Sequence, residues 1–379
     1  MIQPYFEKDG ITIYHGDLLD VLPQLPETSV DCVVTDPPYG ISFMEKGWDY
    51  EVPGPEHWQA IAHVCKPGAL LLAFGGTRTY HRLTCAIEDA GWEIRDCLMW
   101  LQGQGFPKSL DISKSLDKAA GAVREVIGAS RSIDCVERGY TKVYSTKAEN
   151  GGFGTSRTFG LGIPITAPAT PEAAKWNGWG TALKPAWEPI VLAMKPLDGT
   201  FARNAETWGV AGMNIDACRI GTSDQSKGRW PANLLLDEEA ADMLNQRTGV
   251  LKSGVMKAGQ KRKVSRGKNS GYHGNMPDEA TASDTYGDSG GASRFFYVAK
   301  ASKSERNPPG MKNDHPTVKP LALMDYLLTL LSTPTGGVIL DPFAGTGTTA
   351  LAAKQLGRRC ICVELDRHNC DITAARLEG

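Results

Sequence analysis

The tetrapeptide Asp36-Pro37-Pro38-Tyr39 joins a carboxylate, a rigid turn and an aromatic ring directly after an apolar run. The two prolines fix φ and remove two N–H donors, so the turn presents its carbonyls and flanking side chains outward. The Asp36 carboxylate and the Pro37 carbonyl can each accept one hydrogen of an exocyclic amine, and the Tyr39 ring can stack on the planar molecule that carries it. With these residues near their usual frequencies, chance produces such a tetrapeptide in a chain this long about once in a thousand. These residue types together are able to hold a planar molecule by its amine and its ring.

A second stretch, residues 338–366, reads as an apolar run, a glycine-rich turn, a helical stretch and another apolar run that ends in acid. Gly345 and Gly347 allow the backbone to approach a ligand closely, and the following helix offers free N–H groups. The turn lacks the lysine of a phosphate-binding loop and the third glycine of a dinucleotide fingerprint. Glu364 lies about 20 residues beyond the glycines, where an acid typically bonds ribose hydroxyls. We therefore expect a ligand that carries a ribose.

The segment Asp341-Pro342-Phe343-Ala344-Gly345-Thr346-Gly347 resembles the S-adenosylmethionine loop of DNA amino-methyltransferases. The tetrapeptide precedes this loop, with a long segment between them, and this order resembles the β-class of that family. Two segments of the middle region, residues 106–109 and 176–180, resemble parts of phage and prophage members near the target base. Aromatic packing beneath a loop is the alternative reading of these two segments.

The resemblance implies roles for individual residues. The catalytic set is Asp36, Pro37, Pro38 and Tyr39, and the cofactor-binding set is Asp17, Lys319, Asp341, Phe343, Gly345, Gly347, Thr348 and Glu364. In these roles Phe343 lines the cofactor pocket, Glu364 holds the ribose, and Asp17 accepts from the adenine amino group. A Gly-Asp step after a strand is also a common turn, which is the alternative for Asp17. Lys319, in the segment 315–320, is expected beside the methionine end of the cofactor.

The implied reaction moves a methyl group from S-adenosylmethionine to the N6 amine of an adenine that is rotated out of double-stranded DNA. The alternative is the N4 amine of cytosine, since both amines need the same two acceptors. Adenine is favoured because cytosine-specific members of the family more often carry Ser where Asp36 stands. A DNA-binding relative without turnover is a further alternative, and the intact Asp36, Tyr39, Gly345 and Glu364 argue against it. Methylation at cytosine carbon 5 is disfavoured because no Pro-Cys step occurs.

Seven candidate strands must position these residues. They start at Ile11, Val30, Ala69, Glu93, Glu188, Val338 and Arg359, and helices are expected over residues 18–25, 58–66, 79–90, 109–120, 321–331 and 348–356. The expected fold class is α/β, a Rossmann-like methyltransferase sheet of seven mostly parallel strands, with permuted motif order and an inserted DNA-recognition region. Both motifs follow apolar strands, and the carboxyl ends of adjacent parallel strands open onto one crevice. We therefore expect the tetrapeptide and the glycine turn to meet.

Four segments are expected along the chain. Residues 1–102 and 185–198 form the catalytic half of the methyltransferase domain, 103–184 a loop-rich insertion near the target base, 199–300 the target-recognition region, and 301–379 the cofactor-binding half. Residues 251–275 carry seven cations and no acid. The candidate DNA contacts are Lys108, Lys252, Lys257, Lys261, Arg262, Lys263, Arg266 and Lys268. A solvated loop is the alternative for this basic run.

Composition sets outer bounds on function. The 379 residues are 41% hydrophobic and 22% charged, which is typical of a globular protein of one or two domains. A net charge of −2 argues against general polyanion binding, so DNA contacts must come from local basic patches. Nine cysteines without a CxxC pair, no signal segment and no long apolar run predict a cytoplasmic protein that does not span a membrane. The seven histidines are dispersed, so no metal site is expected, and a homodimer is expected from the resemblance.

Overall fold

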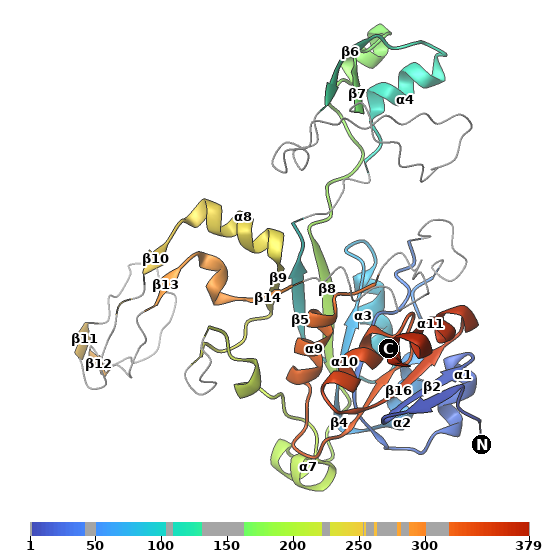
Figure 1. The fold of residues 1–379 in the computed structure, drawn as a ribbon, viewed down its shortest axis with the longest axis vertical. Coiled ribbons are helices and arrows are strands. Elements are labelled where there is room, and N and C mark those ends of the chain that lie inside the picture. The colour runs from blue at the N-terminus through green and yellow to red at the C-terminus, as the bar shows by residue number, and fades with distance from the viewer. Residues whose placement is uncertain are drawn as a thin grey trace. The chain divides into compact units, whose positions relative to one another are not determined.

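A central ten-stranded sheet organises most of the chain in the computed structural model (Figure 1). The structure describes residues 2–41, 51–103, 109–130, 163–221, 228–252, 254, 261–263, 279–281, 288–300 and 318–378. Across the sheet the strands are β1 (Phe6–Lys8), β2 (Ile11–His15), β16 (Arg359–Glu364), β15 (Val338–Asp341), β3 (Val30–Thr35), β4 (Cys65–Phe74), β8 (Trp187–Met194), β5 (Glu93–Leu101), β9 (Leu234–Asp237) and β14 (Tyr297–Ala299). Of these, β1 and β8 run opposite to the other eight.

The α/β class and the mostly parallel sheet are confirmed, but the count of seven strands is wrong. All seven predicted segments form strands of this sheet, and β1, β9 and β14 add to them at its two edges. The additional strands have three or four residues, which is too short for a clear apolar pattern. Residues 199–300, expected to serve target recognition, thus contribute β9 and β14 to the sheet.

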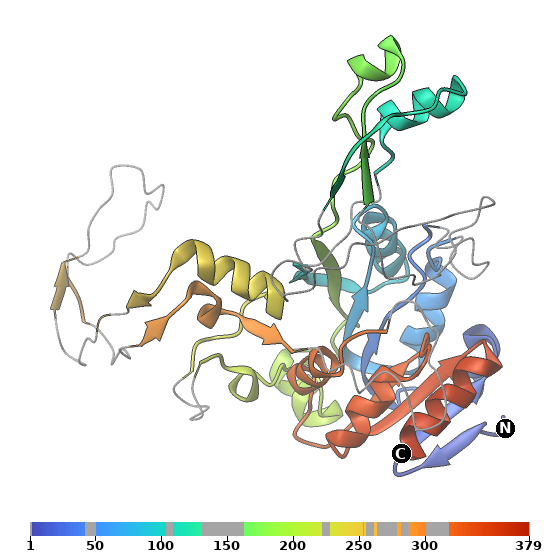
Figure 2. The same ribbon diagram turned by 45° about the horizontal axis from the view of Figure 1, so that its top comes forward.

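Helices cover both faces of the sheet, and each face has its own hydrophobic core. Strand β4 shows the alternation most clearly: Leu70, Leu72 and Phe74 enter one core, while Leu71 and Ala73 enter the other. The first core is closed by α9 (Leu321–Leu330), α10 (Thr348–Gln355) and α11 (Arg367–Glu378), drawn in orange to red in Figures 1 and 2. The second is closed by α1 (Leu18–Val21), the 3-10 turn η1 (Leu22–Gln24), α2 (Pro55–Val64) and α3 (Tyr80–Asp89). The predicted helices over these stretches are confirmed.

Further elements follow β8 in the chain. They are α7 (Phe201–Trp208), the 3-10 turn η4 (Asp216–Cys218), α8 (Glu238–Thr248), the strand pair β10 (Leu251–Lys252) with β13 (Ser289–Gly290), the pair β11 (Lys261–Lys263) with β12 (Glu279–Thr281), and the 3-10 turn η6 (Ala292–Phe295). None of the helices in the described ranges is both long and apolar enough to cross a membrane.

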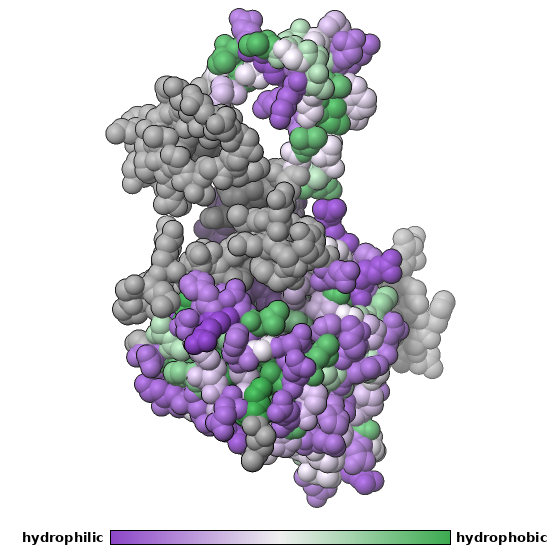
Figure 3. All heavy atoms as spheres, turned by 90° about the vertical axis from the view of Figure 1, so that its right-hand side faces the viewer, coloured by the Kyte–Doolittle hydropathy of each residue, from purple (hydrophilic) through white to green (hydrophobic). Residues whose placement is uncertain are grey.

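The chain divides into two compact units, residues Met1–Gln104 with Ala186–Gly379, and residues Gly105–Pro185. The second unit, here called the insertion, contains α4 (Ile112–Ala119), the hairpin β6 (Val126–Ser130) with β7 (Ile163–Thr166), and α6 (Pro171–Lys175). Several of its hydrophobic side chains are exposed, among them Trp176 and Trp179, so these two rings are not packed beneath a loop. The insertion is at the top of Figure 3, where hydrophobic and hydrophilic side chains alternate.

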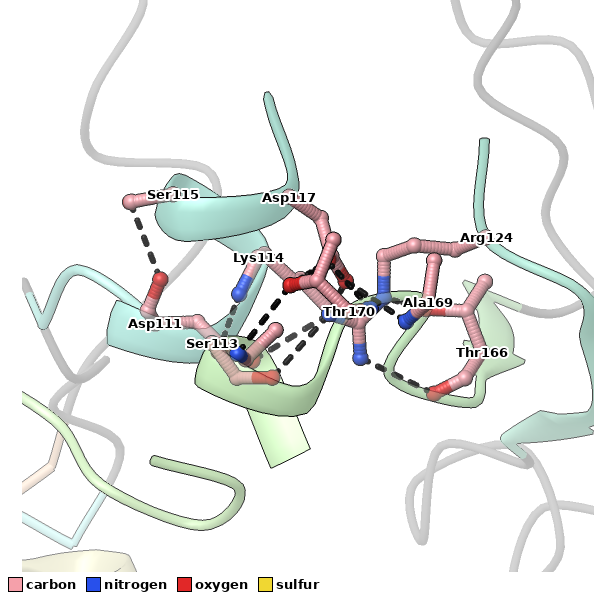
Figure 4. Close-up of polar contacts among 10 residues, drawn as sticks. Asp111, Ser113, Lys114, Ser115, Asp117, Arg124, Thr166, Ala169 and Thr170 are labelled. Atoms are coloured by element: carbon pink, nitrogen blue, oxygen red, sulfur yellow. Dashed lines mark hydrogen bonds and ion pairs between the residues drawn. The ribbon is translucent and has the colours of Figure 1, made fainter. Parts of the chain in front are cut away.

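A buried carboxylate organises the described part of the insertion (Figure 4). The Asp117 carboxylate on α4 accepts hydrogen bonds from Arg124 at 2.6 Å, from the Ala169 amide at 3.0 Å, and from the Thr170 amide and hydroxyl at 3.0 and 2.8 Å. Burial raises the pKa of Asp117, but these hydrogen bonds and the Arg124 charge outweigh burial and lower it. The sequence predicts a loop-rich segment and does not indicate this hydrogen-bonded cluster. The cluster is held by an ion pair and polar groups, which leave no apolar period in the sequence.

Candidate active site

The tetrapeptide and the glycine turn follow adjacent strands of the sheet. Strand β3 is buried along its whole length and ends at Thr35, and it pairs in parallel with β15, where Cys32 faces Ile339 and Val33 faces Leu340. The Thr35 hydroxyl donates a hydrogen bond of 2.6 Å to Asp341, at the end of β15. The predicted meeting of the two motifs at the carboxyl ends of parallel strands is therefore confirmed.

The Asp36 carboxylate is held by a lysine and a phenol. One of its oxygens lies 2.7 Å from the Lys319 ammonium, and the other accepts a hydrogen bond of 2.9 Å from the Tyr39 hydroxyl. Lys319, just before α9, is buried, and its ammonium also lies 3.1 Å from the Tyr39 oxygen and 4.8 Å from the centre of the Phe74 ring. The charge of Lys319 is thus directed at the tetrapeptide, because a buried ammonium needs carboxylate partners. The place expected for Lys319 beside the methionine end of the cofactor stays a prediction.

Glu188 completes this cluster, and sequence reasoning did not assign it a role. Its Oε2 lies 3.3 Å from the Lys319 ammonium and 3.2 Å from the Tyr39 hydroxyl, while Oε1 accepts a hydrogen bond of 2.6 Å from Gln102. Glu188 is near the start of β8. Because β8 runs antiparallel to β4, its start lies at the side of the sheet where the parallel strands have their carboxyl ends. An acid at the start of a predicted strand, directly before a proline, was the only available signal.

The cluster shifts two ionisation equilibria. Burial lowers the pKa of Lys319, but the Asp36 and Glu188 carboxylates outweigh burial and raise it above its usual value. Burial also raises the pKa of Tyr39 well above its usual value, and the same two carboxylates raise it further. At neutral pH Lys319 is therefore an ammonium and Tyr39 a neutral phenol, so neither serves as a general base.

Three contacts fix the Tyr39 residue in place. Its hydroxyl is bonded to Asp36 and Glu188, and its carbonyl accepts a hydrogen bond of 2.6 Å from the Thr79 hydroxyl. A Cβ at Gly76 would lie 3.2 Å from the Tyr39 ring, so the turn after β4 packs closely against the ring. The aromatic ring is thus held at a defined place beside the Asp36 carboxylate.

The glycine turn between β15 and α10 is shaped by left-handed backbone and by α11. Gly345 and Gly347 have φ of 52° and 76°, and a Cβ at Gly347 would lie 2.1 Å from the Thr373 side chain. The Thr373 hydroxyl lies 3.2 Å from the Gly345 carbonyl and 2.8 Å from the Asn369 carbonyl and shares its hydrogen between them, and the buried Arg376 donates to the Thr346 carbonyl. Thr373 and Arg376 were not predicted, because nothing in the local sequence of α11 indicates that it holds the turn.

Asp341 lies beneath the glycine turn and is 2% exposed. One oxygen accepts from Thr35 and from the Phe343 amide at 3.2 Å, and the other accepts from the Thr349 hydroxyl at 2.5 Å. Burial raises the pKa of Asp341 to about 6. The carboxylate predicted to bind cofactor is thus directed into the protein, where it ties β15 to β3 and α10.

Glu364 ends β16 and faces the glycine turn. Its Oε2 accepts a hydrogen bond of 2.7 Å from the Gly345 amide, and Oε1 accepts from the Asp366 amide at 2.8 Å. Burial raises the pKa of Glu364. On the neighbouring strand β2, His15 pairs with Glu364, and Asp17 follows as the exposed N-cap of α1, accepting from the Leu19 amide at 2.8 Å. Asp17 and Glu364 therefore follow adjacent strand ends.

Two more predicted cofactor residues border the same turn. The half-buried Phe343 ring lies 6.3 Å from the Trp58 ring, centre to centre, and packs on the second core. Thr348 is buried at the start of α10, where Arg376 donates to its hydroxyl at 3.4 Å.

The candidate DNA contacts fall in three groups. Lys252 is exposed on β10, and Lys261, Arg262 and Lys263 form β11, whose backbone pairs with β12. Lys108, Lys257, Arg266 and Lys268 lie outside the described residues. In the parts of the chain that the structure describes, no group of His, Cys, Asp and Glu is arranged to hold a metal ion.

A family model described as DNA methylase matches residues 166–375. The chain is similar to the type II methyltransferase M2.DpnII of Streptococcus pneumoniae, with 47% identity over 65 residues, 17% of this chain and 24% of that protein. It is also similar to the type II methyltransferase M.ScaI of Streptomyces caespitosus, with 40% identity over 81 residues, 21% of this chain and 24% of that protein. The matches thus span about a quarter of the length of these curated relatives.

Solved structures also resemble the chain at low identity. M1.HpyAVI is 14% identical with a TM-score of 0.43, over 97% of this chain and 99% of that one. The cytosine-N4-specific PvuII DNA methyltransferase is 14% identical with a TM-score of 0.47, over 98% of this chain and 88% of that one.

Proposed function

The chain belongs to the DNA methylase family of N6 and N4 amino-methyltransferases, and from this premise we propose that it methylates an exocyclic amine of a base in DNA. The methyl donor in this proposal is S-adenosylmethionine, which supplies an electrophilic methyl group on a sulfonium. The observation that carries the proposal is the meeting of Asp36 and the glycine turn at the ends of β3 and β15, linked by the bond from Thr35 to Asp341.

The residues around the glycine turn fit S-adenosylmethionine. A Cβ at Gly347 would collide with Thr373, so glycine at this position lets the turn pack closely on α11. The left-handed backbone at Gly345 and Gly347 sets the shape of the turn that the ligand meets. Glu364 is an acceptor for the ribose hydroxyls, Asp17 for the adenine amino group, and Phe343 offers an apolar surface. Asp341 and Thr348 hold the turn rather than the ligand, because their polar atoms are directed into the protein.

The Asp36 carboxylate is the acceptor that activates the target amine. One of its oxygens accepts a hydrogen bond from Lys319 and the other accepts one from Tyr39, and a carboxylate offers about four lone-pair sites. An amine hydrogen can therefore bind Asp36 beside these partners, while the Pro37 carbonyl takes the second hydrogen. The two acceptors localise the nitrogen lone pair and stabilise the positive charge that grows on the nitrogen during transfer. The Tyr39 ring stacks on the base.

The finer proposal is an adenine-specific enzyme that acts on the N6 amine of a base rotated out of double-stranded DNA. It is supported by Asp at position 36, and the N4 amine of cytosine is the second candidate, since the solved relatives include a cytosine-N4-specific enzyme. The basic run at residues 251–275 is proposed to bind phosphates, with an affinity that falls as salt rises. A homodimer, a cytoplasmic location and a place in a restriction-modification system are proposed on the resemblance alone.

Nucleoside mass spectrometry of unmethylated DNA, incubated with the protein and S-adenosylmethionine, tests the proposal. We expect N6-methyladenine from the wild-type protein and a rate at least about 10²–10³ lower from Asp36→Ala, with cofactor affinity kept. Asp89→Ala, a change of the same kind at an exposed position of α3, is the control. N4-methylcytosine would keep the mechanism and change the base. Wild-type turnover by Asp36→Ala would contradict the mechanism, and no modified base at all would contradict the function.

A further inference from the structure

Lys319 is shared between two carboxylates from different strands. Its ammonium lies 2.7 Å from Asp36 Oδ2, after β3, and 3.3 Å from Glu188 Oε2, on β8. The Tyr39 hydroxyl is shared in the same way, at 2.9 Å from Asp36 Oδ1 and 3.2 Å from Glu188 Oε2. Both donors that hold the Asp36 carboxylate are thus also held by Glu188.

The remaining contacts fix Glu188 in this position. Its Oε1 accepts a hydrogen bond of 2.6 Å from Gln102, at the end of β5, and β5 pairs with β8 through this region. The Glu188 side chain is about a quarter exposed, whereas that of Lys319 is 8% exposed. The buried ammonium therefore has a fixed second anion at its side, and the pair of carboxylates with one cation leaves one net negative charge at the site.

This sharing matters because Lys319 and the substrate amine compete for the same acceptor. A cation paired with Asp36 alone would neutralise the carboxylate and occupy the lone pairs that an amine hydrogen needs. The positive charge that grows on the amine would then meet a neutral pair instead of an anion. A second carboxylate beside the ammonium draws the cation and the phenol proton partly away from Asp36.

We propose that Glu188 is a positioning residue that sets the acceptor strength of Asp36 by sharing Lys319 and the Tyr39 hydroxyl. The proposal rests on the methyltransferase function proposed above and adds a second carboxylate to its site. Glu188 does not touch the amine in this role: it acts through Lys319 and Tyr39. Its removal therefore slows methyl transfer without weakening the binding of cofactor or DNA.

The test measures the single-turnover rate of methyl transfer with both substrates saturating, together with the dissociation constants for S-adenosylmethionine and DNA. Glu188→Gln keeps the shape of the side chain and removes its charge. We expect a rate about 10-fold lower, a smaller loss than the about 10²–10³ for a group that itself stabilises the charge, because Glu188 acts through Lys319 and Tyr39. Both dissociation constants should stay within about 2-fold of wild type. Glu93→Gln is the matched control, because Glu93 is an exposed acid on β5 and pairs with Met194 at the far end of β8; it should leave the rate unchanged.

A double-mutant cycle with Lys319→Met separates this role from a purely structural one. Without the cation only the Tyr39 hydroxyl is left for Glu188 to draw away from Asp36, so Glu188→Gln should cost less than about 3-fold in the Lys319→Met background. Thermal melting checks that each variant is folded. If Glu188→Gln does not fold, Glu188→Asp replaces it, since the shorter acid keeps the charge but draws back from the ammonium.

Each outcome decides the matter. A wild-type rate in the single variant, or an equal loss in both backgrounds, would overturn the role of Glu188 while the methyltransferase function stands. A loss confined to the background that contains Lys319 supports it. If the wild-type protein methylates no base, the proposed function fails, and the role of Glu188 fails with it.

Discussion

Asp341 and Glu364 are the last residues of neighbouring strands, but their carboxylates have different roles. Both oxygens of Asp341 are bonded by hydroxyls and an amide inside the protein, at Thr35, Thr349 and Phe343. Glu364 faces the glycine turn through the Gly345 amide and remains partly exposed. At the scale of single residues, the first is therefore expected to govern stability and the second ligand binding.

Asp341 should make stability depend on pH in an unusual direction. Burial raises its pKa from 3.8 to about 6, so the folded chain favours the protonated acid. Its stabilising contribution is then full below pH 3.8 and is lost as the pH rises through about 6, a change of about 3 kcal/mol. Relative to Asp341→Asn, the free energy of unfolding of the wild-type protein should fall by most of this amount between pH 4 and 7.

Urea unfolding of the two proteins at several pH values measures this difference. Asp20→Asn, on the exposed side of α1, is the control and should show no such change relative to wild type. A difference between wild type and Asp341→Asn that stays constant from pH 4 to 7 would contradict the burial argument.

Glu364→Ala should chiefly weaken cofactor binding. Loss of a charged hydrogen-bond acceptor costs about 1.5–3 kcal/mol, so the dissociation constant for S-adenosylmethionine should rise about 10- to 100-fold. The rate of transfer at saturating cofactor should change little, because Glu364 lies away from Asp36 at the end of β16. Calorimetric titration measures the affinity, with Asp366→Ala as the control. An unchanged affinity in Glu364→Ala would remove the ribose assignment.

At the scale of elements, α11 shapes the glycine turn by occupying the space that side chains of the turn would need. Thr373 leaves no room for a Cβ at Gly347, and it bonds the Gly345 carbonyl, while Arg376 bonds the Thr346 carbonyl. The turn is thus held in an open left-handed form by a helix that follows it in the chain.

Gly347→Ala should therefore disturb both stability and cofactor binding. The new methyl group would lie 2.1 Å from the Thr373 side chain and would also strain a backbone with φ of 76°. Gly357→Ala is the matched control, because Gly357 has φ of 62° and no atom within 4 Å of an added Cβ. The control should cost about 1–2 kcal/mol, and Gly347→Ala clearly more, with weakened S-adenosylmethionine binding. Equal losses in thermal melting would show that Thr373 does not constrain the turn.

At the scale of the whole molecule, the insertion is a compact unit with its own ionic centre at Asp117. The chain leaves and re-enters the larger unit at neighbouring points, since the Gln102 amide donates a hydrogen bond of 2.9 Å to the Ala186 carbonyl. The sheet of the larger unit does not depend on strands from the insertion, because β6 and β7 pair only with each other.

Replacing residues 105–185 by a short Gly-Ser linker should thus leave the larger unit folded. We expect S-adenosylmethionine affinity within about 2-fold of wild type, because short closures between neighbouring ends cost little. DNA affinity should fall, because the resemblance implies that the insertion lies near the target base. Fluorescence titration with cofactor and with DNA measures both. Loss of cofactor binding in this variant would show that the larger unit needs the insertion to fold.

The sequence by itself determined the seven main strands, the helices that cover them, and the meeting of Asp36 with the glycine turn. These features are local: apolar runs set the strands, turn residues follow them, and parallel strands end at one edge. The short strands β1, β9 and β14 and the ionic centre at Asp117 were not predicted, because they leave little or no apolar period in the sequence.

Only the tertiary structure decided which polar groups share a site. Lys319 lies far along the chain from Asp36. Glu188 lies on β8, which runs antiparallel to its neighbours β4 and β5, so the start of β8 lies beside the carboxyl ends of the parallel strands. Thr373 and Arg376 likewise act on a turn that precedes their helix. Local sequence patterns indicate which side chains are buried. The partners of a buried charge depend on which groups lie close to it in the folded chain, and a local pattern does not contain that information.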